Sequence, residues 1–233
     1  MAKNKLQKFQ ENTTFINLFQ PELSSVMTAD FELKGQWNSQ YFKNSNPIVL
    51  ELGCGKGEYT IGLSKLFPNK NFIGIDIKGA RLWRGAKTAT EEHLPNVGFV
   101  RTRIEQIASF FAPNEVDEIW VTFPDPQPRP AKAQKRLTSS RFLNLYAQFL
   151  KPNGIVHLKT DCQPLHEYTR EVVLQNGMRT NVCTKNLYAT VNPNEPILGI
   201  RTFYEQQFLA QGMPITYLNF CMSHKGPFVE PAL

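Results

Sequence analysis

The chain has 233 residues, of which 41% are hydrophobic and 20% charged, and its formal net charge is +6. This composition excludes a disordered chain, and the length is sufficient for a core that needs neither disulfide nor metal. The positive net charge favours an anionic partner, such as nucleic acid or a membrane surface. No stretch of the sequence is apolar over the roughly 18–20 residues that a bilayer span needs, so we expect no membrane segment.

Residues 1–46 are mostly polar, and we expect them to form a partly flexible N-terminal extension ahead of a domain over residues 47–233. The first residues are basic and polar without an apolar run, so no secretion signal is expected. The cysteines (54, 162, 183 and 221) are far apart and show no paired spacing. This pattern favours a reduced, cytoplasmic protein.

From residue 47 onward, short apolar runs alternate with helix-like segments. The runs that predict strands are 47–53, 71–77, 96–102, 116–123 and 154–160. The segments that predict the helices after them are 58–67, 78–93, 103–111, 140–150 and 164–175. Two further strand-like runs, 178–188 and 215–224, flank a predicted helix over 203–212. Repeated βα units predict a doubly wound α/β fold with a mainly parallel, seven-stranded Rossmann-like sheet and an antiparallel last strand.

A glycine-rich loop separates the first predicted strand from the first helix. It reads E-x-G-x-G-x-G, with Glu51 followed by Gly53, Gly55 and Gly57. A dinucleotide site has G-x-G-x-x-G instead. The loop resembles motif I of S-adenosylmethionine-dependent methyltransferases, in which a carboxylate suits the cationic part of the cofactor and glycine amides suit its carboxylate. Asp76 ends the second strand, where an acid accepts the hydroxyls of a cofactor ribose.

Asp125 directly follows the fourth predicted strand and stands between Pro124 and Pro126. The prolines restrict the backbone on both sides, so we expect a fixed carboxylate at the edge of the sheet where ligands bind. From residue 126 to residue 160 there is no acidic residue. The basic residues of this interval are Arg129, Lys132, Lys135, Arg136, Arg141, Lys151 and Lys159. Such a run is often a solvated face, but its place beside Asp125 favours a flexible arm for an anionic ligand.

Together, these motifs resemble the bacterial single-subunit tRNA (guanine-N7-)-methyltransferases, from about residue 47 to residue 223. In chain order they are the glycine loop, Asp76, FPDP with its basic tail, Thr160-Asp161 and Thr202-Phe203-Tyr204-Glu205. The resemblance implies transfer of a methyl group from S-adenosylmethionine to N7 of guanine 46 in the variable loop of tRNA. The sheet is then the Rossmann-like methyltransferase sheet.

The resemblance also implies roles for individual residues. Asp125 is the implied catalytic residue beside the methyl group. The implied cofactor contacts are Glu51, Gly53, Gly55, Gly57, Asp76, Arg103 and Asp125. The implied substrate contacts are Arg129, Asp161, Thr202 and Glu205. The chain departs from the usual family pattern at Arg103, where an Asp is common, and at Gln127 and Arg129, where Trp and Lys are common.

Methylation of guanine N7 needs little acid–base chemistry, because N7 already presents a lone pair. The reaction needs in-line placement of N7 and the methyl group. Carboxylates can accept from guanine N1–H and N2–H₂ and stabilise the positive charge that develops on the ring. Asp125, Asp161 and Glu205 suit these tasks, although Thr202 and Glu205 also form a capping-box pattern.

Two other functions remain open from the residues alone. One is an exocyclic-amine nucleic-acid methyltransferase, whose corresponding loop is typically [DN]-P-P-[YFW]. The other is an RNA-binding module without catalysis. The expected partner is tRNA, with no obligatory protein partner, and the histidines show no metal-ligand spacing, so no metal is expected. Lys78, Arg81, Arg84 and Lys87 line one face of a predicted helix, which fits an RNA contact and a solvated face equally well.

Overall fold

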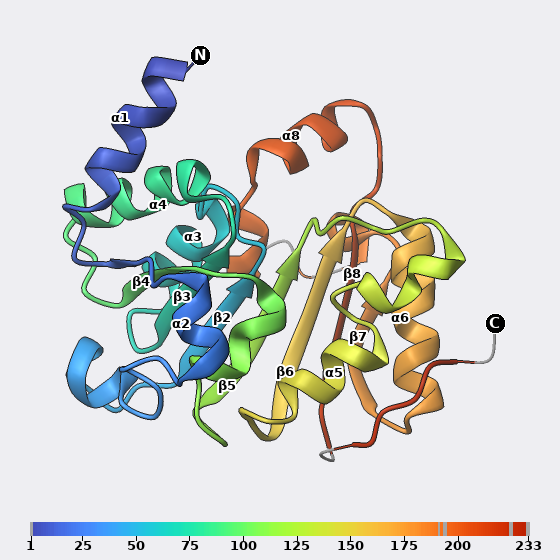
Figure 1. The fold of residues 1–233 in the computed structure, drawn as a ribbon. Coiled ribbons are helices and arrows are strands. Elements are labelled where there is room, and N and C mark those ends of the chain that lie inside the picture. Colours follow the sequence, from blue (N-terminus) through green and yellow to red (C-terminus); the bar gives the residue numbers. More distant parts are fainter. Residues whose placement is uncertain (1, 191, 193–194, 224–225, 232–233) are drawn as a thin grey trace. The chain divides into compact units, whose positions relative to one another are not determined.

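The computed structural model describes residues 2–190, 192, 195–223 and 226–231 (Figure 1). The chain divides into two compact units, Met1–Ala112 and Pro113–Leu233. The domain boundary expected between residues 46 and 47 stays a prediction. Among the described residues, no helix has the length and apolar character needed to cross a membrane.

The strands of the first unit are all parallel. They are β1 (Leu18–Phe19), β2 (Ile48–Leu52), β3 (Asn71–Asp76) and β4 (Val97–Arg101), in the order β1-β4-β3-β2. Every residue of β2 and of β3 is buried, as expected for strands covered on both faces. The register aligns Leu52 of β2 with Ile75 of β3, and Asp76 with Arg101 of β4. The ends of these strands, where ligands bind in such folds, therefore lie level with one another.

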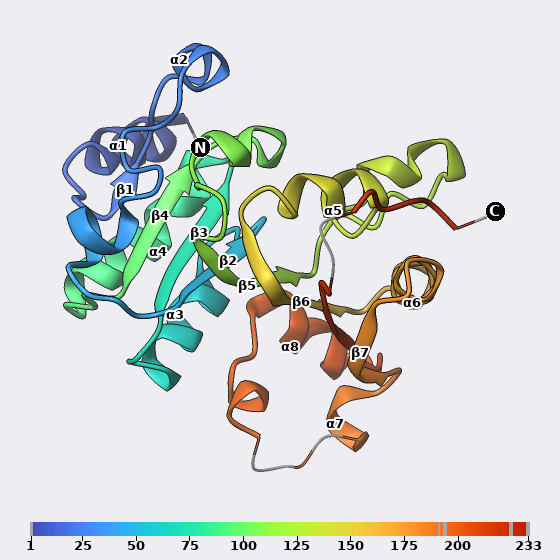
Figure 2. The ribbon, with the colours of Figure 1, turned by 90° about the horizontal axis from the view of Figure 1, so that it is seen from below.

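The helical elements of the first unit are α1 (Ala2–Asn12), α2 (Leu23–Thr28), the π-helical turn η1 (Trp37–Phe42), α3 (Glu58–Leu66), α4 (Gly79–Glu91) and the 3₁₀ helix η2 (Ile104–Ser109). Figure 2 shows α3 on one side of the strands and α2 on the other. Side chains from α3, α4, β1 and β4 share one core cluster, which includes Ile61, Leu82 and Phe99. Trp37 is fully buried and donates from Nε1 to the carbonyl of Phe110 at 2.9 Å.

The strands of the second unit are β5 (Val116–Thr122), β6 (Leu150–Thr160), β7 (Arg179–Thr184) and β8 (Thr216–Cys221), in the order β5-β6-β8-β7. β5 and β6 are parallel, whereas β8 runs antiparallel to both β6 and β7. The helical elements are η3 (Pro130–Lys135), α5 (Ser140–Tyr146), α6 (Gln163–Gln175), α7 (Leu187–Thr190), η4 (Pro196–Gly199) and α8 (Phe203–Ala210). Figure 2 shows α5 and α8 on opposite sides of β5 and β6.

The predicted α/β fold with mainly parallel strands and an antiparallel last strand is confirmed, and β1 is an additional strand in the N-terminal segment. Three elements differ from prediction. The segment 103–111 forms a 3₁₀ helix, closed by an i→i+3 bond from Phe110 N to Ile107 O, instead of an α-helix. α5 ends at Tyr146, and Leu150, predicted as the end of the helix, is the first residue of β6. β7 ends at Thr184, and α7 follows where the strand was expected to continue. Residue 224, the last of the predicted strand 215–224, lies outside the described residues.

Candidate functional site

The glycine loop leads from β2 into α3. Gly53, Gly55 and Gly57 have φ angles of 75°, 58° and 73°, a region that favours glycine. A Cβ at Gly57 would lie 2.6 Å from Cε1 of Phe99, so close packing also excludes a side chain there. A Cβ at Gly55 would meet nothing within 4 Å. The loop is therefore tightly packed at Gly57 and open at Gly55, where a ligand has room to approach.

Asp76 ends β3 in direct contact with this loop. Its Oδ2 accepts a hydrogen bond from the backbone N–H of Gly55 at 3.0 Å, and its Oδ1 accepts from that of Lys78 at 2.7 Å. The side chain is 9% exposed. Each carboxylate oxygen offers two lone pairs, so further donors such as hydroxyls can still be accepted.

Glu51 lies in β2 and is buried. Its Oε2 accepts from the backbone N–H of Thr60 at 2.8 Å and from the Thr60 hydroxyl, which fixes the first turn of α3 against the strand. Burial raises the pKa of the neighbouring Cys54 thiol, and the charges of Glu51 and Asp76 act in the same direction. Cys54 is therefore a neutral thiol and a poor nucleophile. Arg103, between β4 and η2, has an exposed side chain.

In the second unit, Asp125 lies three residues beyond the end of β5 and is exposed. Its Oδ1 accepts from the backbone N–H of Gln127 at 3.1 Å. The register pairs Thr122 of β5 with Lys159 of β6. Asp161, which directly follows β6, therefore comes at the same edge as Asp125. The structure thus brings two of the predicted carboxylates to the carboxyl ends of neighbouring parallel strands.

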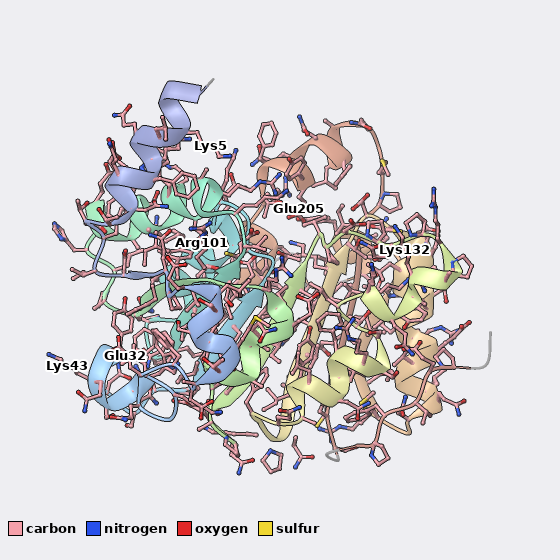
Figure 3. All side chains as sticks on the ribbon, in the orientation of Figure 1. Lys5, Glu32, Lys43, Arg101, Lys132 and Glu205 are labelled. Atoms are coloured by element: carbon pink, nitrogen blue, oxygen red, sulfur yellow. The ribbon has the colours of Figure 1, made fainter. Side chains whose placement is uncertain are left out.

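The basic stretch after Asp125 contains a short helical element. Pro130–Lys135 form η3, and the side chains of Arg129, Lys132 and Lys135 are exposed. Figure 3 labels Lys132 among them. Lys151 instead pairs with Asp117 at 2.6 Å. Lys159 is fully buried in β6. It is therefore not part of an exposed basic surface.

Glu205 occupies an unexpected environment. It is fully buried on α8 (labelled in Figure 3). Its Oε1 pairs with Nζ of Lys159 at 2.8 Å and accepts from the Tyr188 hydroxyl at 2.5 Å. The capping box is present as the sequence predicted: Glu205 N donates to Thr202 Oγ1 at 3.3 Å, and Thr202 N donates to Glu205 Oε2 at 3.4 Å. Burial lowers the pKa of the Lys159 ammonium, whereas the charge of Glu205 opposes this shift. Both carboxylate oxygens of Glu205 are thus already engaged within the second unit.

Sequence reasoning missed the partners of Glu205. The signal for Lys159 was a lysine within a mostly apolar predicted strand, where a buried charge requires a partner. Tyr188 gave no local signal, because its contact with Glu205 joins α7 to α8. No group of three or more His, Cys, Asp or Glu side chains in the described part of the chain is arranged to hold a metal ion.

Comparison with solved structures identifies the fold. A 16S rRNA methyltransferase, KamB, covers 82% of this chain and 92% of its own with a TM-score of 0.60 at 17% identity. A 30S ribosomal A1408 methyltransferase from an uncultured bacterium matches with a TM-score of 0.58 at 16% identity, covering 82% and 94%. The model of a family described as putative methyltransferases matches residues 45–218. The fold is therefore that of a methyltransferase, and the family match covers the glycine loop as well as both strand ends that carry Asp125 and Asp161.

Comparison with curated proteins is more specific. A tRNA (guanine-N(7)-)-methyltransferase of Christiangramia forsetii is 52% identical over 219 residues, which are 94% of this chain and 98% of that protein. The protein of the same name from Bacteroides fragilis is 48% identical over 231 residues, covering 99% and 90%. The chain belongs to the tRNA (guanine-N(7)-)-methyltransferase family.

Proposed function

We propose that this protein transfers the methyl group of S-adenosylmethionine to N7 of guanine 46 in the variable loop of tRNA. The observation that supports this most is the near-complete alignment with tRNA (guanine-N(7)-)-methyltransferases. The two carboxylates at the ends of β5 and β6 agree with the chemistry that this reaction needs. The proposed catalytic domain comprises residues 47–233, in the cytoplasm.

The residues of the first unit fit S-adenosylmethionine. Gly55 leaves open space in front of the loop, and Asp76 retains lone pairs for ribose hydroxyls. Glu51 supplies the buried negative charge behind the loop, and Arg103 lies beyond the neighbouring strand β4. The bound cofactor supplies an electrophilic methyl group, and these residues hold and orient it.

The residues of the second unit fit a guanine. We propose that Asp125 lies beside the reacting N7 and stabilises the positive charge that develops on the ring. Asp161 is the proposed acceptor for N1–H and N2–H₂. Arg129 contacts the RNA, and the Thr202–Glu205 turn supports the base. Glu205 is fully buried and its Oε1 is engaged by Lys159 and Tyr188, so direct acceptance from the base requires α8 to expose this carboxylate.

Methylation of unmodified tRNA tests the proposal. Incubation with labelled S-adenosylmethionine, followed by digestion to nucleosides, is expected to place the label in 7-methylguanosine. A tRNA with adenine in place of guanine 46 is the matched control and should remain unlabelled. Label in an exocyclic-amine nucleoside would instead support the alternative methyltransferase, and binding of tRNA without binding of S-adenosylmethionine would support the non-catalytic module.

A basic surface on the first unit fits the RNA backbone. Helices α1 and α4 lie side by side (Figure 1). Residues of both helices, of the glycine loop and of α3 line a hollow of about 460 Å³: Lys8, Lys56, Glu58, Arg81, Trp83 and Arg84. The Trp83 ring is fixed in place. Its Nε1 donates to Glu11 at 2.7 Å, and the ammonium groups of Lys8 and Lys87 lie 4.5 and 5.1 Å from its centroid. The ring thus supports cations rather than a stacked base, so we propose that this surface contacts phosphates.

Removing this charge is expected to weaken tRNA binding without changing cofactor binding. The logarithm of tRNA affinity falls linearly with the logarithm of salt concentration, and the steepness of this line is the salt slope. The triple variant Lys8→Ala/Arg81→Ala/Arg84→Ala should reduce the salt slope by about 1 for each phosphate that is no longer neutralised. The matched control is Lys34→Ala/Lys43→Ala/Lys70→Ala, which removes the same charge elsewhere on this unit. Filter binding at several salt concentrations measures both. Equal salt slopes for the two triple variants would contradict the assignment.

A further inference from the structure

The backbone around Asp125 is strained on both sides. Phe123 and Gln127 are not glycines, yet their φ angles are 47° and 46°. The left-handed region is unfavourable for residues that carry a Cβ, and it persists only where surrounding contacts enforce it. Phe123 is held by the bond from its N–H to the carbonyl of Lys159, at 2.8 Å. The contacts that hold Gln127 must be found elsewhere in the second unit.

Arg136 supplies the contacts to Gln127. Its Nε and Nη2 both donate to the Gln127 carbonyl oxygen, at 3.3 and 3.2 Å. The guanidinium lies 4.2 Å from the ring centroid of Tyr168 on α6, and the planar guanidinium suits such stacking. Arg136 is therefore partly buried and directed at the Asp125 loop, although the sequence grouped it with a phosphate-binding arm.

Tyr168 connects Arg136 to the C-terminal segment. It is 5% exposed, and its hydroxyl donates to Oε2 of Glu230 at 2.6 Å. The other carboxylate oxygen of Glu230 accepts from the backbone N–H and the hydroxyl of Ser140, at 2.9 and 2.8 Å. Glu230 thus joins the first residue of α5 to the ring on which Arg136 rests.

The C-terminal segment is itself firmly docked. Asn144 exchanges two hydrogen bonds with the backbone of Phe228, both at 2.9 Å. Asn176 does the same with the backbone of Val229, at 2.8 and 2.9 Å. Side-chain amides that pair with both the N–H and the carbonyl of one residue fix its position, so Glu230 is presented to Tyr168 in a defined place.

We propose that Arg136, Tyr168 and Glu230 are positioning residues, which hold Gln127 in its left-handed conformation and thereby fix the Asp125 carboxylate for methyl transfer. The C-terminal segment then acts on the site through a continuous chain of contacts. This proposal rests on the proposed function, because it assumes that Asp125 lies beside the reacting atoms. It differs from phosphate binding in a measurable way: a positioning residue affects kcat, whereas a phosphate contact affects KM for tRNA.

Steady-state methylation of unmodified tRNA separates the two roles. Arg136→Ala is expected to lower kcat about 10- to 100-fold, since small misplacements have effects of this size, with KM for tRNA within about threefold of the wild type. Tyr168→Phe keeps the ring beneath the guanidinium but removes the bond to Glu230, so a smaller fall in kcat is expected. The matched control is Arg170→Ala, an exposed arginine on the same helix as Tyr168, which should change neither constant.

A rescue experiment addresses the strain directly. Glycine tolerates positive φ, so Arg136→Ala/Gln127→Gly is expected to recover part of the kcat that Arg136→Ala loses. Hydrogen exchange at the Gln127 amide, which is bonded to Asp125, gives a readout without activity, and it should quicken in Arg136→Ala and not in Arg170→Ala.

The results distinguish failure of this proposal from failure of the proposed function. A wild-type protein that forms no 7-methylguanosine overturns the function, and hydrogen exchange then still reports whether Arg136 holds the loop. An Arg136→Ala variant with unchanged kcat, raised KM and a reduced salt slope overturns the positioning role. Unchanged exchange at Gln127 overturns it as well.

Discussion

Replacing Asp125 by asparagine is expected to lower kcat for tRNA methylation by about 10²–10³-fold, the usual cost of losing one preorganised electrostatic contact to the transition state. Asparagine keeps the shape of the side chain and an oxygen that can accept the Gln127 N–H, so the loop should retain its conformation. Only the negative charge beside the developing positive charge is removed. Labelled methyl transfer to unmodified tRNA measures kcat.

The control for this variant must separate chemistry from binding. Calorimetry of Asp125→Asn should show a much smaller change in affinity for S-adenosylmethionine, because the proposed cofactor contacts are mostly those of the first unit. Glu171→Gln removes the same charge from an exposed position on α6 and should leave kcat unchanged. If the kcat of Asp125→Asn lies within threefold of the wild-type value, the carboxylate does not stabilise the transition state.

The position of Asp125 was predictable from the sequence for local reasons. An apolar run that ends at a proline-flanked acid places that acid at a strand end, and β5 does end at Thr122. The glycine loop was predictable for a similar reason, because three alternating glycines imply three positive φ angles, and all three occur. Features specified by neighbouring residues are therefore the ones that sequence reasoning recovers.

The environments of Arg136 and Glu205 were not predictable, because residues distant in the chain create them. Arg136 stacks on a tyrosine of α6, and Glu205 pairs with a lysine of β6. Neither contact has a periodic or spaced pattern. Arg136 therefore looked like a member of a basic run, and Glu205 looked like a capping-box residue that contacts the substrate. Tertiary packing within the second unit determines the environments of both side chains.

One of the fold differences, the 3₁₀ helix in place of an α-helix over 103–111, has the same origin. The 3₁₀ helix over Ile104–Ser109 is followed by Phe110 and Phe111, which are fully buried. The Phe110 carbonyl accepts from the buried indole of Trp37, a contact with the N-terminal segment that helix propensity does not anticipate. Tertiary contacts of this kind override local propensity.

Replacing Lys159 by methionine is expected to destabilise the protein by about 3–5 kcal/mol, because Glu205 would remain buried without its counter-charge. Both side chains are fully buried, and their charged atoms lie 2.8 Å apart, so solvent cannot take over the role of either one. Urea unfolding followed by circular dichroism measures the loss of stability. The urea concentration at the midpoint should fall, while the dependence of the unfolding free energy on urea concentration stays the same.

The double variant Lys159→Met/Glu205→Gln tests whether the pair itself causes this loss. Removing both charges eliminates the unpaired carboxylate, so the double variant should be more stable than the sum of the two single changes predicts, by a coupling energy of about 1–3 kcal/mol. The residual loss should be small, because a glutamine in place of Glu205 keeps the capping-box geometry at Thr202 and an acceptor for the Tyr188 hydroxyl. The outcome against this prediction is that each single variant loses less than about 1 kcal/mol of unfolding free energy and that the two losses simply add. The ion pair would then not stabilise α8. Because Lys159 also stands two residues before Asp161 and accepts the Phe123 N–H at its carbonyl, this pair joins α8 to the two strand ends that present Asp125 and Asp161.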